Sequence, residues 1–430
     1  MLWPFSAILL GNACSIPGRH DFAGQSMHAP AVTPLPFEVR RAILGLGLSQ
    51  IVGWGTTYYL LSLLGSRIGS DLGLSNGLIL AGVSITLGCA AVIGPQVGRW
   101  QDRAGSRVVM TTGSVIIAAG LALLSLAQNW ITYYLCWIII GIGSPMALYS
   151  ASFTALTQIA GRSSRRAISY LTFMGGLAST LSWPATAWLM GFLDWRTIAL
   201  MFAGLNLAIC IPIHLTCLGR RTIDENGAEA AEVIEAGIPR EAQPLAFILL
   251  SAMLALTGAI VNSWSLLVFP VLIGIGFTSG VAVFVGSIVG IWQVVGRMGE
   301  MLLARRLSIF WTGLVAVGFL PIAFTILLNA GGNVVIGSAF AAFYGISNGL
   351  LTIARGGMVL AIFGARGYGE QINKITVAQN IAGALAPVAG GYMLDSVGAN
   401  TVLDIMLGIS ALGLALLLVL HRHCARNGLH

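Results

Sequence analysis

The chain has 430 residues, of which 57% are hydrophobic and only 9% are charged, and it carries a net charge of +7. It also contains 55 glycines, and its mean hydropathy is strongly positive. A water-soluble globule of this length needs far more polar surface, so the composition excludes a soluble protein and predicts one embedded in a lipid bilayer.

Runs of roughly 20 apolar residues, the length that crosses the ~30 Å hydrocarbon layer as a helix, recur between charged or turn-rich breaks. We predict about twelve such helices, and hence an all-α fold, because the runs are apolar on all sides and too long for barrel strands. The first six cover 42–65, 77–98, 108–127, 131–157, 167–190 and 197–218. The second six cover 245–271, 280–303, 308–328, 334–362, 373–393 and 400–420.

The basic loop residues indicate the orientation of the chain. When the chain is arranged as twelve membrane-spanning helices, only Arg67 and Arg196 fall on one side of the membrane. The other side receives Arg40, Arg41, Arg99, Arg103, Arg107, Arg162, Arg165, Arg166, Arg220, Arg221, Arg240, Arg305, Arg306, Arg366, Lys374, Arg422 and Arg426. By the positive-inside rule both termini are cytoplasmic, in a multi-pass protein of the plasma or inner membrane. Topology explains the basic charge, so no nucleic-acid partner is expected.

The N-terminal segment 1–39 is left unassigned. Its apolar stretch has no basic start and is too short to span, so a signal peptide or a thirteenth helix fits poorly. Met27 is an alternative start of translation.

The two halves of the chain resemble each other at a shift of about 200 residues. The coinciding pairs are Pro184 with Pro387, Asp194 with Asp395, Gly141 with Gly345, Arg162 with Arg366, and the loop of Arg103 and Arg107 with that of Arg305 and Arg306. We therefore predict two six-helix bundles, at 40–218 and 245–421, joined by a cytoplasmic linker at 219–244 and followed by a tail at 422–430. A duplicated bundle of this kind favours a transporter that rocks two halves about a central site.

One loop of the first half carries four charged residues in ten, in the stretch GRWQDRAGSR. It resembles the loop motif G-x-x-x-D-R-x-G-R-[RK] of the major facilitator superfamily, and the resemblance covers about residues 40 to 420. The matching positions are Gly98, Asp102, Arg103, Gly105 and Arg107, whereas Ser106 departs from the usual arginine. The resemblance implies a latch that holds the two halves together in the outward-facing state. The alternative is that these charges only set topology, and for Arg107 both interpretations stay open.

Arginine within a membrane span costs at least ~2.5 kcal/mol at the centre, so each instance is a candidate site. Arg297 lies in the eighth span between Gln293 and Glu300, and Arg355 lies in the tenth. An arginine at this place on the eighth helix resembles the substrate-anion arginine of the oxalate/formate and monocarboxylate porters. Its guanidinium presents a planar fork of donors to a carboxylate. Pairing of Arg297 with Glu300, or snorkelling of both arginines toward the headgroups, are the alternatives.

Several other side chains are candidates for a substrate cavity or for coupling. In the first span, Trp54 and Tyr58 share a face with other polar residues. Trp292, Gln293 and Asn380 are further substrate-binding candidates. Glu300, the only acid well inside a span, is the candidate for proton coupling.

The remaining signals exclude other functions. The only lysine, Lys374, is not in a P-loop context, so no ATP is expected. We find no metal-ligand or CxxC spacing and no catalytic constellation, so we predict neither a cofactor nor a metal nor an enzyme, and we expect a functional monomer.

The sequence therefore predicts a secondary active transporter of a small organic anion, a carboxylate, that works by alternating access with proton or exchange coupling. A multidrug efflux pump is the alternative, although Trp137 stands where that branch usually has an arginine. A non-transporting membrane sensor on the same fold is the third candidate.

Overall fold

The structure, a computed structural model, describes residues 35–219, 236–303 and 308–429. The segment before residue 35, most of the predicted linker, and Arg305 and Arg306 lie outside these ranges. Within them the chain is helical, without strands. The first half (35–219) contains α2 (Phe37–Thr56), α3 (Leu60–Leu72), α4 (Asn76–Ala104), α5 (Ser106–Ser125), α6 (Trp130–Ala147), α7 (Tyr149–Ala160), α8 (Ser164–Gly175), α9 (Ala178–Leu189), α10 (Trp195–Leu205) and α11 (Ile211–Cys217).

The second half (236–429) is built from longer helices. They are α12 (Gln243–Gly274), α13 (Ser279–Leu303), α14 (Ile309–Leu328), α15 (Val334–Phe363) and α16 (Tyr368–Arg426). The last one joins two passes across Gly398, whose φ of 83° is not helical. Glycine adopts this left-handed conformation without the steric cost that a Cβ would add.

Each of the twelve predicted spans coincides with one helical pass of the described chain. The structure differs from the prediction in that four passes are not uniform α-helices. The first, fourth and fifth are broken near Thr57, Leu148 and Gly176, and the sixth contains a π-helical turn at Asn206–Cys210. Among the described residues nine helices are long and apolar enough to cross a membrane on their own. The remaining passes are interrupted by short breaks or contain more polar residues, so they do not reach this length and hydropathy on their own.

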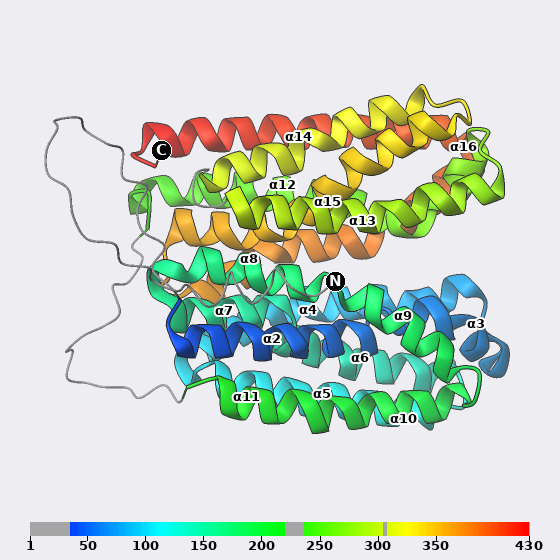
Figure 1. Cartoon of the computed structure of the whole chain (residues 1–430), viewed down its shortest axis with the longest axis horizontal. Helices are drawn as coiled ribbons and strands as arrows, with labels where there is room; N and C mark the ends of the chain where they lie inside the picture. Colours follow the sequence, from blue (N-terminus) through cyan, green and yellow to red (C-terminus); the bar gives the residue numbers. More distant parts are fainter. Residues whose placement is uncertain (1–34, 220–235, 304–307, 430) are drawn as a thin grey trace, which may run out of the picture.

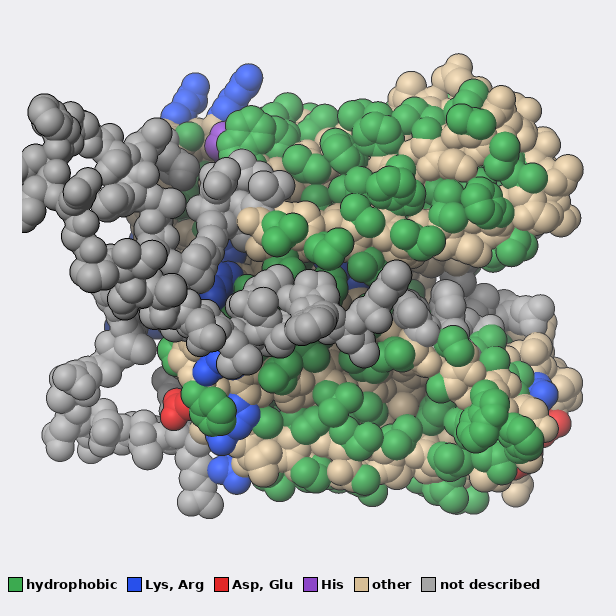
Figure 2. All heavy atoms as spheres, viewed as in Figure 1, with side chains coloured by type: hydrophobic (Ala, Val, Ile, Leu, Met, Phe, Trp, Pro, Cys, Tyr) green, Lys and Arg blue, Asp and Glu red, His purple; other side chains and the backbone are tan. Residues whose placement is uncertain are grey.

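The passes form two bundles that lie one above the other in Figure 1, the first half below and the second half above. We call the end where α2 begins and α16 finishes the basic end, because Lys and Arg side chains gather there in Figure 2. Apolar side chains cover much of the flanks that this view shows. Such a surface suits contact with lipid rather than water.

The two halves share one hydrophobic core. Its largest cluster of buried side chains combines first-half residues such as Phe153 and Ile168 with many from the second half. A separate cluster around Leu60, Ile117 and Trp137 contains residues of the first half alone.

Helices α4 and α16 run antiparallel across the boundary between the halves. Their printed contacts keep one register from Gly98 beside Gly369, through Gly94 beside Asn373, to the Ser84 hydroxyl donating to the Ala384 carbonyl at 3.2 Å. These contacts extend from the basic end toward the middle of the bundle.

Candidate functional site

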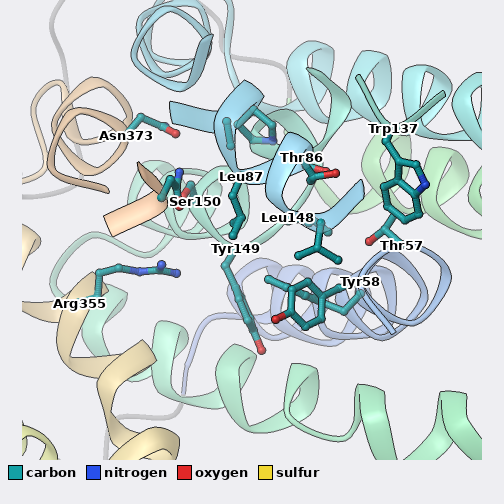
Figure 3. Close-up of a pocket in the computed structure, with 16 residues that line it drawn as sticks. Thr57, Tyr58, Thr86, Leu87, Trp137, Leu148, Tyr149, Ser150, Arg355 and Asn373 are labelled. Carbon is teal, nitrogen blue, oxygen red and sulfur yellow. The ribbon is translucent and has the colours of Figure 1, made fainter. Parts of the chain in front are cut away.

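A cavity with about 720 Å³ of empty space, counting the part that opens to solvent, lies between the two halves (Figure 3). Most of its wall comes from the first half, and α15 and α16 contribute three polar residues. It is lined by Trp54, Thr57, Tyr58, Val83, Thr86, Leu87, Ala90, Trp137, Ser144, Pro145, Leu148, Tyr149, Ser150, Arg355, Asn373 and Asn380. The structure therefore brings together four of the predicted substrate-binding residues, namely Trp54, Tyr58, Arg355 and Asn380.

The break between α2 and α3 places Trp54 and Tyr58 at the cavity. The sequence before it, GWGTT, combines glycines with β-branched residues, which are weak helix formers. The hydroxyls of Thr56 and Thr57 donate to the carbonyls of Val52 and Gly53 at 2.8 and 2.6 Å. Such back-bonding bends helices, and here the chain leaves the α-helix at Thr57.

A second break separates α6 from α7 at Leu148, which has an extended backbone. Pro145 precedes it inside α6 and removes one backbone N–H donor from the helix. The buried Gln50 amide holds the break in place by donating to the Ala147 carbonyl at 2.9 Å and to the Ser152 hydroxyl at 2.8 Å. Discontinuous helices of this kind are typical of transporter sites, because they aim side chains and backbone groups into the cavity.

Arg355 on α15 is the only charged residue among the described residues that line the cavity. One of its terminal nitrogens donates to the Gln379 side-chain oxygen at 3.3 Å, and its guanidinium lies 5.9 Å from the Phe153 ring centroid. Within the described ranges its buried Nε–H has no hydrogen-bond partner. A buried donor without an acceptor is costly, so this arrangement suits a ligand that brings an anionic oxygen.

Aromatic side chains form the wall beside Trp54. The Trp54 ring lies 5.6 Å from that of Tyr58 and 5.3 Å from that of Tyr149, between centroids. The buried indole N–H of Trp54 also lacks a hydrogen-bond partner in the described part of the chain. Trp54 thus offers both an apolar face and an unused donor.

The other substrate-binding candidates of the eighth span do not line the cavity. Trp292 and Gln293 pack tightly against Gly345 and Gly349 on α15. Arg297 is only 7% exposed, and its Nε–H donates to the Gly349 carbonyl at 3.3 Å. A terminal nitrogen of Arg297 lies so close to Gly176 that a Cβ there would be 1.7 Å away. Gly349 on α15 and Gly176, directly after α8, leave room for the guanidinium between the helices, and Arg297 is not among the residues that line the cavity.

Glu300 pairs across the halves with Arg165 on α8, rather than with Arg297. The distance from Arg165 Nη2 to Glu300 Oε1 is 3.4 Å, and the same nitrogen donates to the Thr312 hydroxyl at 3.3 Å. The Glu300 side chain is 3% exposed, and its second oxygen, Oε2, has no hydrogen-bond partner among the residues that the structure describes. Nothing in the spacing of the sequence indicated Arg165 as its partner.

At the basic end, Asp102 joins the end of α4 to the start of α16. Its two carboxylate oxygens accept backbone N–H hydrogen bonds from Gly369 at 3.1 Å and from Glu370 at 2.8 Å. An anion at the first turn of a helix is favoured by the unsatisfied N–H groups and by the helix dipole.

The rest of the motif divides into residues at this contact and residues away from it. Gly98 lies at the contact, since a Cβ there would be 2.1 Å from the Gly369 carbonyl oxygen. Gly105, with a φ of 84°, makes the turn between α4 and α5. The described part of the chain shows no ion pair for Arg103, which is exposed and precedes the turn, or for Arg107, which follows it.

Arg99, a variable position of the motif, reaches across instead. It pairs with Glu370 at 3.3 Å, and Lys374 pairs with the same carboxylate at 2.7 Å. The hydrogen bond from Lys374, with Arg99 alongside, holds the pKa of the Glu370 carboxyl below its usual value of 4.5.

The comparisons with known proteins agree with this architecture. Residues 46–337 match the family model described as Major Facilitator Superfamily. The chain belongs to this superfamily. It is also 24% identical over 315 residues to a protein of Gibberella moniliformis called an MFS-type transporter, which covers 72% of this chain and 73% of the relative. This superfamily member is therefore a multi-pass membrane transporter rather than an enzyme.

Two solved structures of the superfamily share the fold. The human organic anion transporter MFSD10 (TETRAN) has a TM-score of 0.67 at 15% identity, over 89% of this chain and 100% of its own. The proton:xylose symporter XylE bound to 6-bromo-6-deoxy-D-glucose has a TM-score of 0.66 at 14% identity, over 88% and 94%. An anion transporter and a sugar symporter match almost equally well, so the fold does not decide the cargo.

Proposed function

We propose that this transporter moves a small organic anion, a carboxylate, whose charged group binds Arg355 in the cavity. The observation that carries the proposal is that, among the described residues, Arg355 is the one charged side chain in the lining and has a buried Nε–H without an acceptor. A carboxylate satisfies that donor and neutralises the charge in a single contact.

The lining favours an anion over the cations that multidrug efflux pumps often carry. Among the described residues that line the cavity none is acidic, so an organic cation would find no counter-charge and would meet Arg355. Like charges at close range disfavour binding. A multidrug efflux pump would need a cavity that binds its substrates without Arg355.

Alternating access supplies the mechanism. The contacts of Asp102, Arg99 and Gly98 with α16 close the basic end, and they have to open for the cavity to be reached from that side. We place the basic end in the cytoplasm of a cell with the protein in its plasma or inner membrane, because this orientation follows the positive-inside rule. The state described here is then closed toward the cytoplasm.

Glu300 is our candidate for proton coupling, through its pair with Arg165. Protonation would remove the negative charge that holds Arg165 across the halves, and the proton would sit on a carboxyl with one oxygen that is already unpaired. Binding of a proton would therefore favour separation of α8 from α13. Exchange of anions without protons is the alternative, and it predicts that Glu300→Gln transports normally.

The test is counterflow of labelled carboxylates in proteoliposomes, with cationic dyes as the competing substrate class. Wild type is compared with Arg355→Gln, Arg355→Lys and Arg297→Gln. We expect Arg355→Gln to abolish carboxylate counterflow and Arg355→Lys to retain part of it, because lysine keeps the charge without the planar fork. Movement of dyes, or equal carboxylate counterflow in Arg355→Gln, would overturn the proposal. Loss in Arg297→Gln alone would move the anion site to α13.

A further inference from the structure

The charged and apolar parts of the cavity wall lie at different sides. In Figure 3 Arg355 and Asn373 enter from one side, whereas Thr57, Thr86 and Trp137 lie at the other. Between them stand Leu87, Leu148 and the two tyrosines, Tyr58 and Tyr149. A ligand that fills this space meets a cation at one end only.

The far wall carries no charged residue among the described residues that line the cavity. The Thr57 hydroxyl donates to the Gly53 carbonyl at 2.6 Å, and the Thr86 hydroxyl donates to the Gly82 carbonyl at 3.1 Å. Both hydroxyl hydrogens are thus used within their own helices. Trp137, 1% exposed, adds an indole ring whose buried N–H has no hydrogen-bond partner among the described residues, so this side offers a neutral donor but no cation.

The middle of the wall suits a ring. Trp54 contacts both Tyr58 and Tyr149, with centroid distances of 5.6 and 5.3 Å. Rigid aromatic side chains bind planar apolar groups with little loss of their own conformational freedom. Leu87 and Leu148 present branched apolar surface beside them.

We infer that the substrate is a monocarboxylate with a ring-sized apolar body, which places its carboxylate on Arg355 and its ring against Trp54 and Tyr58. This inference rests on the proposed function and narrows the substrate class. A second carboxylate on the far side of the ring would lie against a wall whose described residues include no cation, and a buried charge without a counter-charge is strongly disfavoured. A short acid such as acetate would leave the aromatic wall unfilled.

The experiment uses the full chain, purified in detergent for equilibrium binding of labelled benzoate and reconstituted for counterflow, with uptake into protein-free vesicles subtracted. Three competitors each differ from benzoate in one feature. Acetate lacks the ring, terephthalate adds a carboxylate at the far side, and benzamide lacks the charge. We expect acetate and terephthalate to need at least tenfold higher concentrations than benzoate for half-displacement, and benzamide not to compete.

Two variants test the assignment of each wall. Trp54→Ala should lower the affinity for benzoate at least fivefold and leave the affinity for acetate unchanged, because acetate does not reach the aromatic side chains. Thr86→Lys adds a cation to the far wall and should raise the affinity for terephthalate, relative to that for benzoate, at least tenfold. Thr86→Val removes the hydroxyl without adding charge, and its terephthalate-to-benzoate ratio should equal that of wild type.

The outcomes distinguish a failure of this inference from a failure of the proposed function. If acetate or terephthalate competes as well as benzoate, the ring-bearing monocarboxylate is wrong and a carboxylate transporter remains. If no carboxylate binds, or benzamide competes as well as benzoate, the proposed function itself fails. A Thr86→Lys ratio equal to that of Thr86→Val would also overturn the inference.

Discussion

The carboxylate of Asp102 accepts a hydrogen bond from the backbone N–H of Glu370 at 2.8 Å, and so joins the first half of the chain to the second. The same carboxylate accepts from the Gly369 N–H at 3.1 Å. A single side chain thereby satisfies two donors at the start of α16. This contact is the candidate for the part that breaks and re-forms in each transport cycle.

Asp102→Asn should weaken this latch. The amide keeps one acceptor but turns an NH₂ group toward a backbone donor and removes the charge, which together cost about 1.5–3 kcal/mol for a charge-assisted contact. We expect a population with longer distances between spin labels at the exposed positions 103 and 366, measured by pulsed electron resonance. Arg107→Ala, at a residue for which the described part of the chain shows no ion pair, is the matched control and should leave the distance distribution unchanged. An unaltered distance distribution in Asp102→Asn would show that the contact does not hold the halves.

Gly98→Ala tests the close approach of α4 and α16. Its Cβ would lie 2.1 Å from the Gly369 carbonyl oxygen, which is backbone and has to move, so we expect a loss of roughly 1–3 kcal/mol in the closed state. Gly88→Ala on the same helix is the matched control, because a Cβ there meets nothing within 4 Å. It should be neutral or stabilising by up to about 1 kcal/mol through helix propensity. Thermal unfolding in detergent measures both, and equal midpoints would refute the steric argument.

The pattern of apolar runs was enough to predict every helical pass, because length and hydropathy alone decide whether a segment crosses a bilayer. The breaks at Thr57 and Leu148 were missed, since proline, glycine and threonine within a span do not by themselves show where a helix opens. Trp54, Tyr58 and Arg355, which line the cavity, could be named as candidates because polar or aromatic groups on one face of a span stand out. The exclusion of Arg297 from the cavity depends on Gly176 and Gly349 packing beside it, and such long-range contacts leave no signal in a single sequence. Arg99 and Arg165 were missed for the same reason, as their partners lie in the other half.

Acidification should weaken the ion pairs at the basic end, and the pKa of the Glu370 carboxyl sets the pH at which this happens. Its pKa is lowered in the folded protein, first by the hydrogen bond from Lys374 and then by Arg99, so its pairing stabilises the fold above the usual glutamate pKa of 4.5. That contribution is lost as the pH falls through the depressed value. We expect Glu370→Gln to unfold at a lower temperature than wild type at pH 7, and the difference to close below pH 4.5. A difference that stays constant with pH would mean that Glu370 contributes through shape rather than charge.

The pair of Arg165 and Glu300 should respond asymmetrically to mutation. Glu300 is 3% exposed and its second oxygen is unpaired, whereas Arg165 is 25% exposed. Removal of the arginine leaves a buried carboxylate without its counter-charge, which should lower the free energy of unfolding by about 3–5 kcal/mol. Removal of the carboxylate leaves a cation that water can reach in part. Arg165→Gln should therefore destabilise the protein more than Glu300→Gln does.

A double-mutant cycle measures this asymmetry. Adding Glu300→Gln to Arg165→Gln should recover most of the lost thermal stability, because no uncompensated charge then remains at the boundary between the halves. The same variants separate coupling from stability: if Glu300 carries the proton, counterflow persists in Glu300→Gln while uptake driven by a pH gradient is lost. Additive losses in the cycle would show that the two side chains act independently, and gradient-driven uptake in Glu300→Gln would exclude it as the coupling group.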